Sequence, residues 1–168
     1  VVLLFCCSCV SDVQLEEDST VYNSEFDAQQ EYASSDGRLC KVGSVYYYMP
    51  IITNRVLYYD DETGTSGLLC GKADCTHEDA SCNSYVNAYG SCIQAYQEKL
   101  YWIEQNTLYR MELDGSNHEG IGILERPDKS AVMEGVNPRF VIHRDMLYIS
   151  TMKPTVIEEE AKTEVSIY

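Results

Sequence analysis

Three cysteines and one histidine lie within thirteen consecutive residues of this chain, at Cys70, Cys75, His77 and Cys82. Three thiolates and one imidazole form a complete ligand set for a structural zinc ion, and this segment is short enough to wrap around one ion. Such a set fills all four positions of a tetrahedral ion and leaves none for a catalytic water. The segment could therefore hold a structural zinc ion.

The same cysteines could equally form disulfides, which a location outside the cytoplasm favours. Cys75 and Cys82 would close a small loop, and Cys70 would then pair with Cys40 or Cys92. These five cysteines are odd in number, so at least one of them stays unpaired in a monomer that has only disulfides. The spacing is not that of a standard zinc finger, so zinc, disulfides and unlinked thiols all stay open. In each case we expect the segment to have a structural role, holding a loop between two sheet units.

The residues around this segment predict strands. From Gly37 onward, short runs of β-branched and aromatic residues alternate with turn residues, which is typical of strands. No segment sustains a helical period over three turns. The clearest runs are Val45–Met49, Val56–Tyr59, Ile93–Tyr96, Leu100–Ile103, Thr107–Met111, Arg139–Ile142 and Met146–Ile149. The sequence therefore predicts an all-β chain.

The predicted strands recur as a unit. Leu57-Tyr58 and Leu108-Tyr109 each precede a turn with Asp and Gly, and Val45-Tyr46, Leu100-Tyr101 and Leu147-Tyr148 match one another in the strand before. The copies lie roughly 50 residues apart, a spacing typical of propeller blades. One small twisted sheet cannot bury both of its faces alone, so repeated sheets stack on their neighbours.

A stretch of the second copy resembles a known family. Leu100-Tyr101-Trp102-Ile103-Glu104, followed by a strand that ends in Leu113-Asp114-Gly115-Ser116-Asn117, is similar to a blade of the YWTD and TolB-like propellers. Over Gly37 to Tyr168, the chain resembles propeller lipoproteins of unassigned role from anaerobic Gram-positive bacteria. The resemblance implies a β-propeller of four-stranded antiparallel blades. It also implies that this chain is an N-terminal fragment with two to three of the blades. The expected parts are blade one at 37–69, a cysteine-rich loop at 70–91, blade two at 92–124 and an incomplete blade three at 136–168.

The N-terminal residues predict a location outside the cytoplasm. The apolar run Val1 to Phe5 and the pair Ser8-Cys9 resemble the end of a bacterial lipoprotein signal. We therefore expect a signal remnant at 1–9, a lipid on Cys9 and anchoring to the outer face of the cell membrane. Cys6 or Cys7 could carry the lipid instead, and an ordinary secretory signal is a further alternative. Residues 10–36 are polar and acidic, which predicts a flexible tether.

Composition narrows the choice of partners. The formal net charge of −15 argues against nucleic acid, whose phosphates this surface would repel, and against binding to anionic lipid through a basic patch. Among the 14 tyrosines, Tyr85 and Tyr89 follow the cysteines in a loop and could contact a sugar or a peptide. His118 follows an Asp-Gly turn and is expected to be a solvated turn residue.

These features predict a non-catalytic binding or scaffold module for a protein, peptide or glycan at the cell surface. The sequence contains no Gly-x-Ser-x-Gly, His-Glu-x-x-His or phosphate-loop motif. Two alternatives stay open: a propeller-type hydrolase or lyase with its active site in missing blades, and a purely structural envelope protein. The predicted binding role depends on analogy with the fold.

Overall fold

The computed structural model describes residues 37–87, 91–124, 139–157 and 160–167. The predicted signal remnant at 1–9, the tether at 10–36, the lipid site Cys9 and the ligand residue Tyr89 all lie outside the described residues. None of the described segments forms an apolar helix of the length needed to cross a bilayer.

The described residues form strands and no helix, which confirms the all-β prediction. The strands are β1 (Leu39–Val42), β2 (Val45–Tyr48), β3 (Leu57–Asp60), β4 (Ser66–Leu68), β5 (Ile93–Tyr96), β6 (Lys99–Glu104), β7 (Thr107–Glu112), β8 (Glu119–Ile123), β9 (Arg139–His143), β10 (Met146–Ile157) and β11 (Glu160–Ile167). Each of the seven predicted runs overlaps one of them. The runs did not predict β1, β4, β8 or β11.

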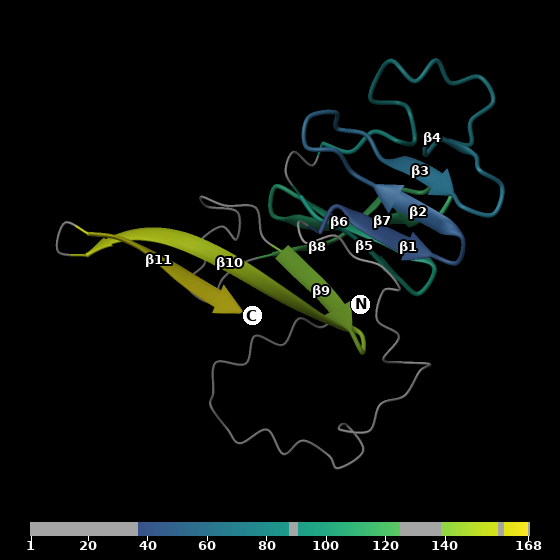
Figure 1. Cartoon of the computed structure of the whole chain (residues 1–168). Coiled ribbons are helices and arrows are strands. Elements are labelled where there is room, and N and C mark those ends of the chain that lie inside the picture. The colour runs from purple at the N-terminus through teal and green to yellow at the C-terminus, as the bar shows by residue number, and fades with distance from the viewer. Residues whose placement is uncertain (1–36, 88–90, 125–138, 158–159, 168) are drawn as a thin grey trace, which may run out of the picture.

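The strands build three antiparallel sheets, each from consecutive segments of the chain (Figure 1). The first sheet has the order β1-β2-β3-β4 and the second has β5-β6-β7-β8, so two of the sheets are four-stranded as predicted. The third has three strands in the order β11-β10-β9. Within this part of the chain the sheets form a row of similar units and do not close into a ring.

Each sheet begins with a two-residue hairpin, in which both turn residues have positive φ in the second and third sheets and only Gly43 does in the first. Two residues join the first strand to the second, and the pairs that close these turns are Val42 with Val45, Tyr96 with Lys99 and His143 with Met146. The turn residues with positive φ are Gly43, Gln97, Glu98, Arg144 and Asp145, at 46° to 61°. Tight hairpins favour positive φ because it matches the twist of the strands. The shared turn is independent support for a repeated unit.

The turns correct the alignment of the first copy with the second. The sequence matched Val45 with Leu100, but the closing pairs match Val45 with Lys99 and so Tyr46 with Leu100. A shift of one residue moves every side chain to the opposite face of a sheet. The turn, and not the likeness of the residues, decides which face each tyrosine occupies.

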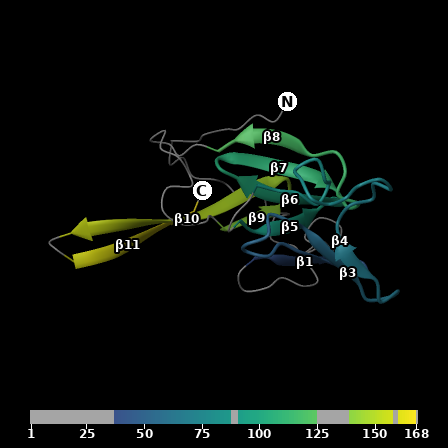
Figure 2. The same cartoon turned by 90° about the horizontal axis from the view of Figure 1, so that it is seen from above.

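The second sheet lies between the other two and contributes to two separate cores (Figure 2). In β6, Leu100 and Trp102 pack towards the first sheet, whereas Tyr101 and Ile103 pack with residues of the third. The four residues are all buried. This is why β6 has an unbroken apolar run where a half-exposed strand would alternate with polar residues.

Candidate metal centre

The segment with the predicted metal ligands connects the end of β4 to the start of β5. Two backbone turns shape it: the N–H of Cys75 donates to the carbonyl of Lys72, and the N–H of Cys82 donates to the carbonyl of Asp79, both at 3.4 Å. Each turn therefore ends on a cysteine. Residues 69–87 of this connection, here called the metal segment, contain no strand, so side chains and their partners must hold their shape.

The structure brings all four predicted ligands together. The sulfur atoms of Cys70, Cys75 and Cys82 and a ring nitrogen of His77 all lie within 4.8 Å of one another. Zn–S bonds of about 2.3 Å would place the sulfurs of a tetrahedral site about 3.8 Å apart, so small shifts would close the shell. The cluster could therefore hold a metal ion such as zinc.

His77 has a left-handed backbone conformation within the cluster. Its φ is 61°, in the left-handed region that residues other than glycine rarely adopt. With this backbone, the Nδ1 atom lies 3.3 Å from the sulfur of Cys82. The conformation turns His77 towards the three thiols.

The described cysteines do not form the predicted disulfides. Cys40, Cys70, Cys75 and Cys82 are all free thiols, so Cys70 is joined to neither Cys40 nor Cys92. Cys40 lies in the core between the first two sheets, where burial raises the pKa of its thiol to about 12. A thiol that resists ionisation and packs among apolar side chains is suited to the core and not to a metal.

Local hydrogen bonds favour the thiolate form at two of the three clustered cysteines. Burial opposes ionisation of Cys70, but backbone N–H groups of Lys72 and Asn83 donate to its sulfur, and its pKa falls below the usual value. Burial likewise opposes ionisation of Cys82, and the hydroxyl and N–H of Ser84 outweigh it and lower the pKa. Metals bind thiolates, so these contacts prepare the ligands.

Cys75 behaves differently, because its neighbours are the other two sulfurs. The N–H of His77 favours the thiolate, but burial and the nearby Cys82 and Cys70 outweigh it and raise the pKa of Cys75. Three thiolates close together repel one another, so all three ionise together only if a cation neutralises them. The electrostatics of the cluster are therefore those expected of a cation site.

The metal segment also supports the loop between β2 and β3. The N–H of Val56 donates to the carbonyl of Ser84 at 2.8 Å, and the N–H of Val86 donates to the carbonyl of Asn54 at 3.0 Å. Arg55 adds a hydrogen bond to the carbonyl of Asp79 at 3.0 Å, and its guanidinium lies 5.2 Å from the centre of the Tyr85 ring. These contacts give Tyr85, which was predicted to contact a ligand, a partner within the chain.

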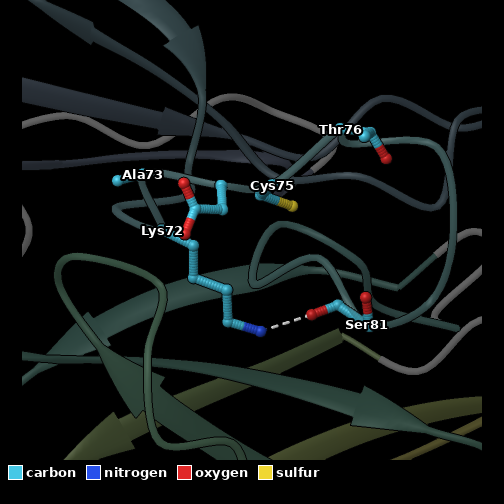
Figure 3. A pocket seen from close by; sticks show the side chains of 6 residues that line it. Lys72, Ala73, Cys75, Thr76 and Ser81 are labelled. Atoms are coloured by element: carbon cyan, nitrogen blue, oxygen red, sulfur yellow. Dashed lines mark hydrogen bonds between the residues drawn. The ribbon is translucent and has the colours of Figure 1, made fainter.

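An open pocket of about 430 Å³ lies beside the cluster. Figure 3 shows Lys72, Cys75, Thr76 and Ser81 around it, with the Lys72 ammonium donating to the Ser81 carbonyl. Cys75 and His77 are half-buried, whereas Cys82 is fully buried. A metal ion could therefore reach the cluster from the side of Cys75.

The described chain thus belongs to the class of all-β proteins built from repeated antiparallel sheets, with a Cys₃His cluster in the connection between two of them. Comparison with protein-family models, with curated proteins and with solved structures finds no match. The function must therefore be argued from the sheets and the cluster.

Proposed function

We propose that the chain is part of an extracytoplasmic β-propeller protein that acts as a non-catalytic binding or scaffold module for a protein, peptide or glycan. The observation that carries this proposal is the row of three antiparallel units that each open with a two-residue hairpin, the middle one packed on both faces. Units that cover one another in this way support propeller-like stacking. The YWTD and TolB-like resemblance and the lipid anchor at Cys9 belong to this proposal.

The proposal includes a structural zinc ion at Cys70, Cys75, His77 and Cys82. The four protein ligands would complete its coordination shell, so the ion would fold the segment and perform no reaction. A folded segment would in turn hold the loop between β2 and β3, because residues 54–56 take their backbone partners from it. The module would thereby present loops of defined shape at the end of the sheets where both loops lie.

The metal is tested on the full chain with Cys6→Ser, Cys7→Ser and Cys9→Ser, so that the N-terminal thiols cannot contribute. Native and denaturing mass spectrometry should show one zinc per chain that a chelator removes. Cys82→Ala should lose the zinc, and Cys40→Ala, a matched change in the core, should keep it. A denatured mass that rises by two or four hydrogens on reduction would instead show disulfides and overturn the zinc site.

The binding role is tested by applying the intact chain to glycan and peptide arrays. A saturable ligand that is recovered unchanged supports a binding module. Cleavage of an arrayed compound by the purified chain would overturn the non-catalytic assignment. The proposed anchor predicts a diacylglyceryl group on Cys9 in protein isolated from its native host, and an unmodified Cys9 in peptide mass spectra would contradict it.

A further inference from the structure

His118, in the loop between β7 and β8, is bound to the metal segment. Its Nε2 atom lies 2.8 Å from the carbonyl oxygen of Asn83 and 3.0 Å from that of Gly115. Both partners only accept hydrogen bonds, so Nε2 must carry the hydrogen. His118 is exposed, as its sequence context predicted, but it is also a link between residues 35 positions apart.

The second sheet holds the His118 ring from the other side. The ring packs edge-to-face on Trp102, with centroids 5.2 Å apart and planes at 68°. Trp102 is only 1% exposed and stacks on Tyr109 at 5.4 Å. The indole therefore cannot move without disturbing the core, and His118 rests on a rigid support.

The Asn83 carbonyl that accepts from His118 belongs to a peptide group whose N–H contacts the sulfur of Cys82. The Asn83 carbonyl and the Ser84 N–H are parts of one trans peptide, in which the two bonds point in opposite directions. The Ser84 N–H donates to the sulfur of Cys82, and the Ser84 hydroxyl lies 3.1 Å from the same sulfur. A donor that holds the carbonyl on one side therefore aims the N–H at the sulfur on the other.

A second contact joins the same two parts of the chain. Gly115 has a φ of 82°, and a Cβ at this position would collide with the carbonyl oxygen of Leu69, the residue before Cys70. Only glycine allows the turn between β7 and β8 to approach the metal segment so closely. The turn between β7 and β8 thus contacts the metal segment at two places, next to Cys70 and next to Cys82.

We propose that His118 is a positioning residue of the metal centre, which orients the peptide between Asn83 and Ser84 so that its N–H donates to the Cys82 sulfur. This inference depends on the proposed zinc site. It implies that zinc affinity depends on the second sheet, although every ligand lies outside that sheet. Groups that orient metal ligands typically change metal affinity by about 10- to 100-fold.

The test measures zinc affinity by competition with a chromogenic chelator, using the full chain with the three N-terminal cysteines replaced by serine. His118→Phe keeps the aromatic contact with Trp102 and removes the donor, and we expect zinc binding about tenfold weaker. His118→Gln restores an N–H donor and should recover most of the affinity. The thiolate-to-metal absorption of the Co²⁺ form should shift in the Phe variant and return in the Gln variant. His143→Phe, on β9 of the third sheet, is the control and should change neither reading.

The outcomes separate the two proposals. If the chain with His118 binds no zinc, the structural zinc site and this inference both fail. If it binds zinc and His118→Phe binds it equally well, only the role of His118 fails. A variant that does not fold leaves a direct measurement on the zinc-loaded chain with His118 intact: ¹⁵N spectra should show hydrogen on Nε2 of His118. A neutral ring protonated only on Nδ1 would overturn the inference.

Discussion

The first and second sheets have the same strand order and opening hairpins of the same length, but they stabilise their loops in different ways. In the second sheet two residues, Gln105 and Asn106, join β6 to β7 directly after the pair of Glu104 with Thr107, and the Asn106 carbonyl accepts from the N–H of Leu124. In the first sheet a longer loop, residues 49–56, joins β2 to β3 and takes its partners from the metal segment. A long irregular loop leaves backbone groups that need partners from elsewhere.

The two sheets also differ in how much of each is covered. The second sheet packs on both faces, whereas the first has tyrosines with large exposed areas, Tyr48 on β2 and Tyr59 on β3. The sheet with less packing is therefore the one to which the metal segment attaches. Both sheets share one apolar core, so a metal ion at the cluster would add to the stability of the first sheet, which has the less covered outer face.

The largest difference should come from substitutions at matching positions of the two sheets. The opening hairpins match Trp102 with Tyr48, which are 1% and 43% exposed. Trp102→Ala should cost about 3 to 5 kcal/mol, because it leaves a cavity between the sheets. Tyr48→Ala should cost about 1 kcal/mol or less. Urea unfolding of both variants measures the change in the free energy of unfolding. Equal decreases in the two variants would refute the difference in packing.

Metal removal should affect the first sheet and spare the second. At a zinc concentration 1,000 times the Kd, binding contributes about 4 kcal/mol to the stability of the chain. Chelation should raise amide hydrogen exchange in residues 49–56 and 69–87, and leave the turn at Gln105 protected. Hydrogen-exchange mass spectrometry with and without chelator gives the answer. Uniform deprotection of both sheets would show that the ion does not act locally.

A smaller effect is expected from two arginines. Arg55 contacts both Asp79 and Tyr85 of the metal segment, whereas Arg110 on β7 makes a surface ion pair with Glu119 at 2.7 Å. Arg55→Ala should lower the free energy of unfolding by about 1 kcal/mol, because it removes a hydrogen bond and a cation–π contact. Arg110→Ala should cost less than about 0.5 kcal/mol. A larger loss at Arg110, seen in thermal unfolding, would contradict the special role of the metal segment.

The smallest effect concerns a feature that both sheets share. Hydrogen bonds from the hydroxyl and N–H of Ser116 lower the pKa of Asp114 in the turn between β7 and β8, and hydroxyls of Ser44 and Thr63 lower the pKa of Asp60 in the matching turn. A lowered pKa stabilises the fold above the carboxyl's unfolded pKa of about 3.9, and this stability is lost as pH falls through the lower folded pKa.

Asp114→Asn and Asp60→Asn should each flatten the loss of stability below about pH 4 by a similar amount. Denaturant unfolding from pH 5 downward, with each variant beside the unsubstituted chain, tests this. A flattening in only one of the two would show that the turns are not equivalent.

Part of the fold was predictable because strong strand residues are local signals. The apolar and aromatic runs in β2, β3, β5, β6, β7, β9 and β10 predicted their strands. The apolar runs do not include β4 and β8, because glycines, Gly67 in one and Gly120 and Gly122 in the other, stand where β-branched residues usually identify a strand. Their partners β3 and β7 recruit them by backbone pairing, which residue types do not reveal.

The sequence by itself determined the all-β class and the four possible metal ligands, because both depend on residue types within short segments. It left the choice between zinc and disulfides open, because that choice depends on where the sulfur atoms lie in space. Only the tertiary structure decided the rest: which face each tyrosine occupies, how the metal segment supports the loop of residues 49–56, and that His118 reaches Asn83. These contacts join residues far apart in the chain, so they exist only once the sheets have stacked.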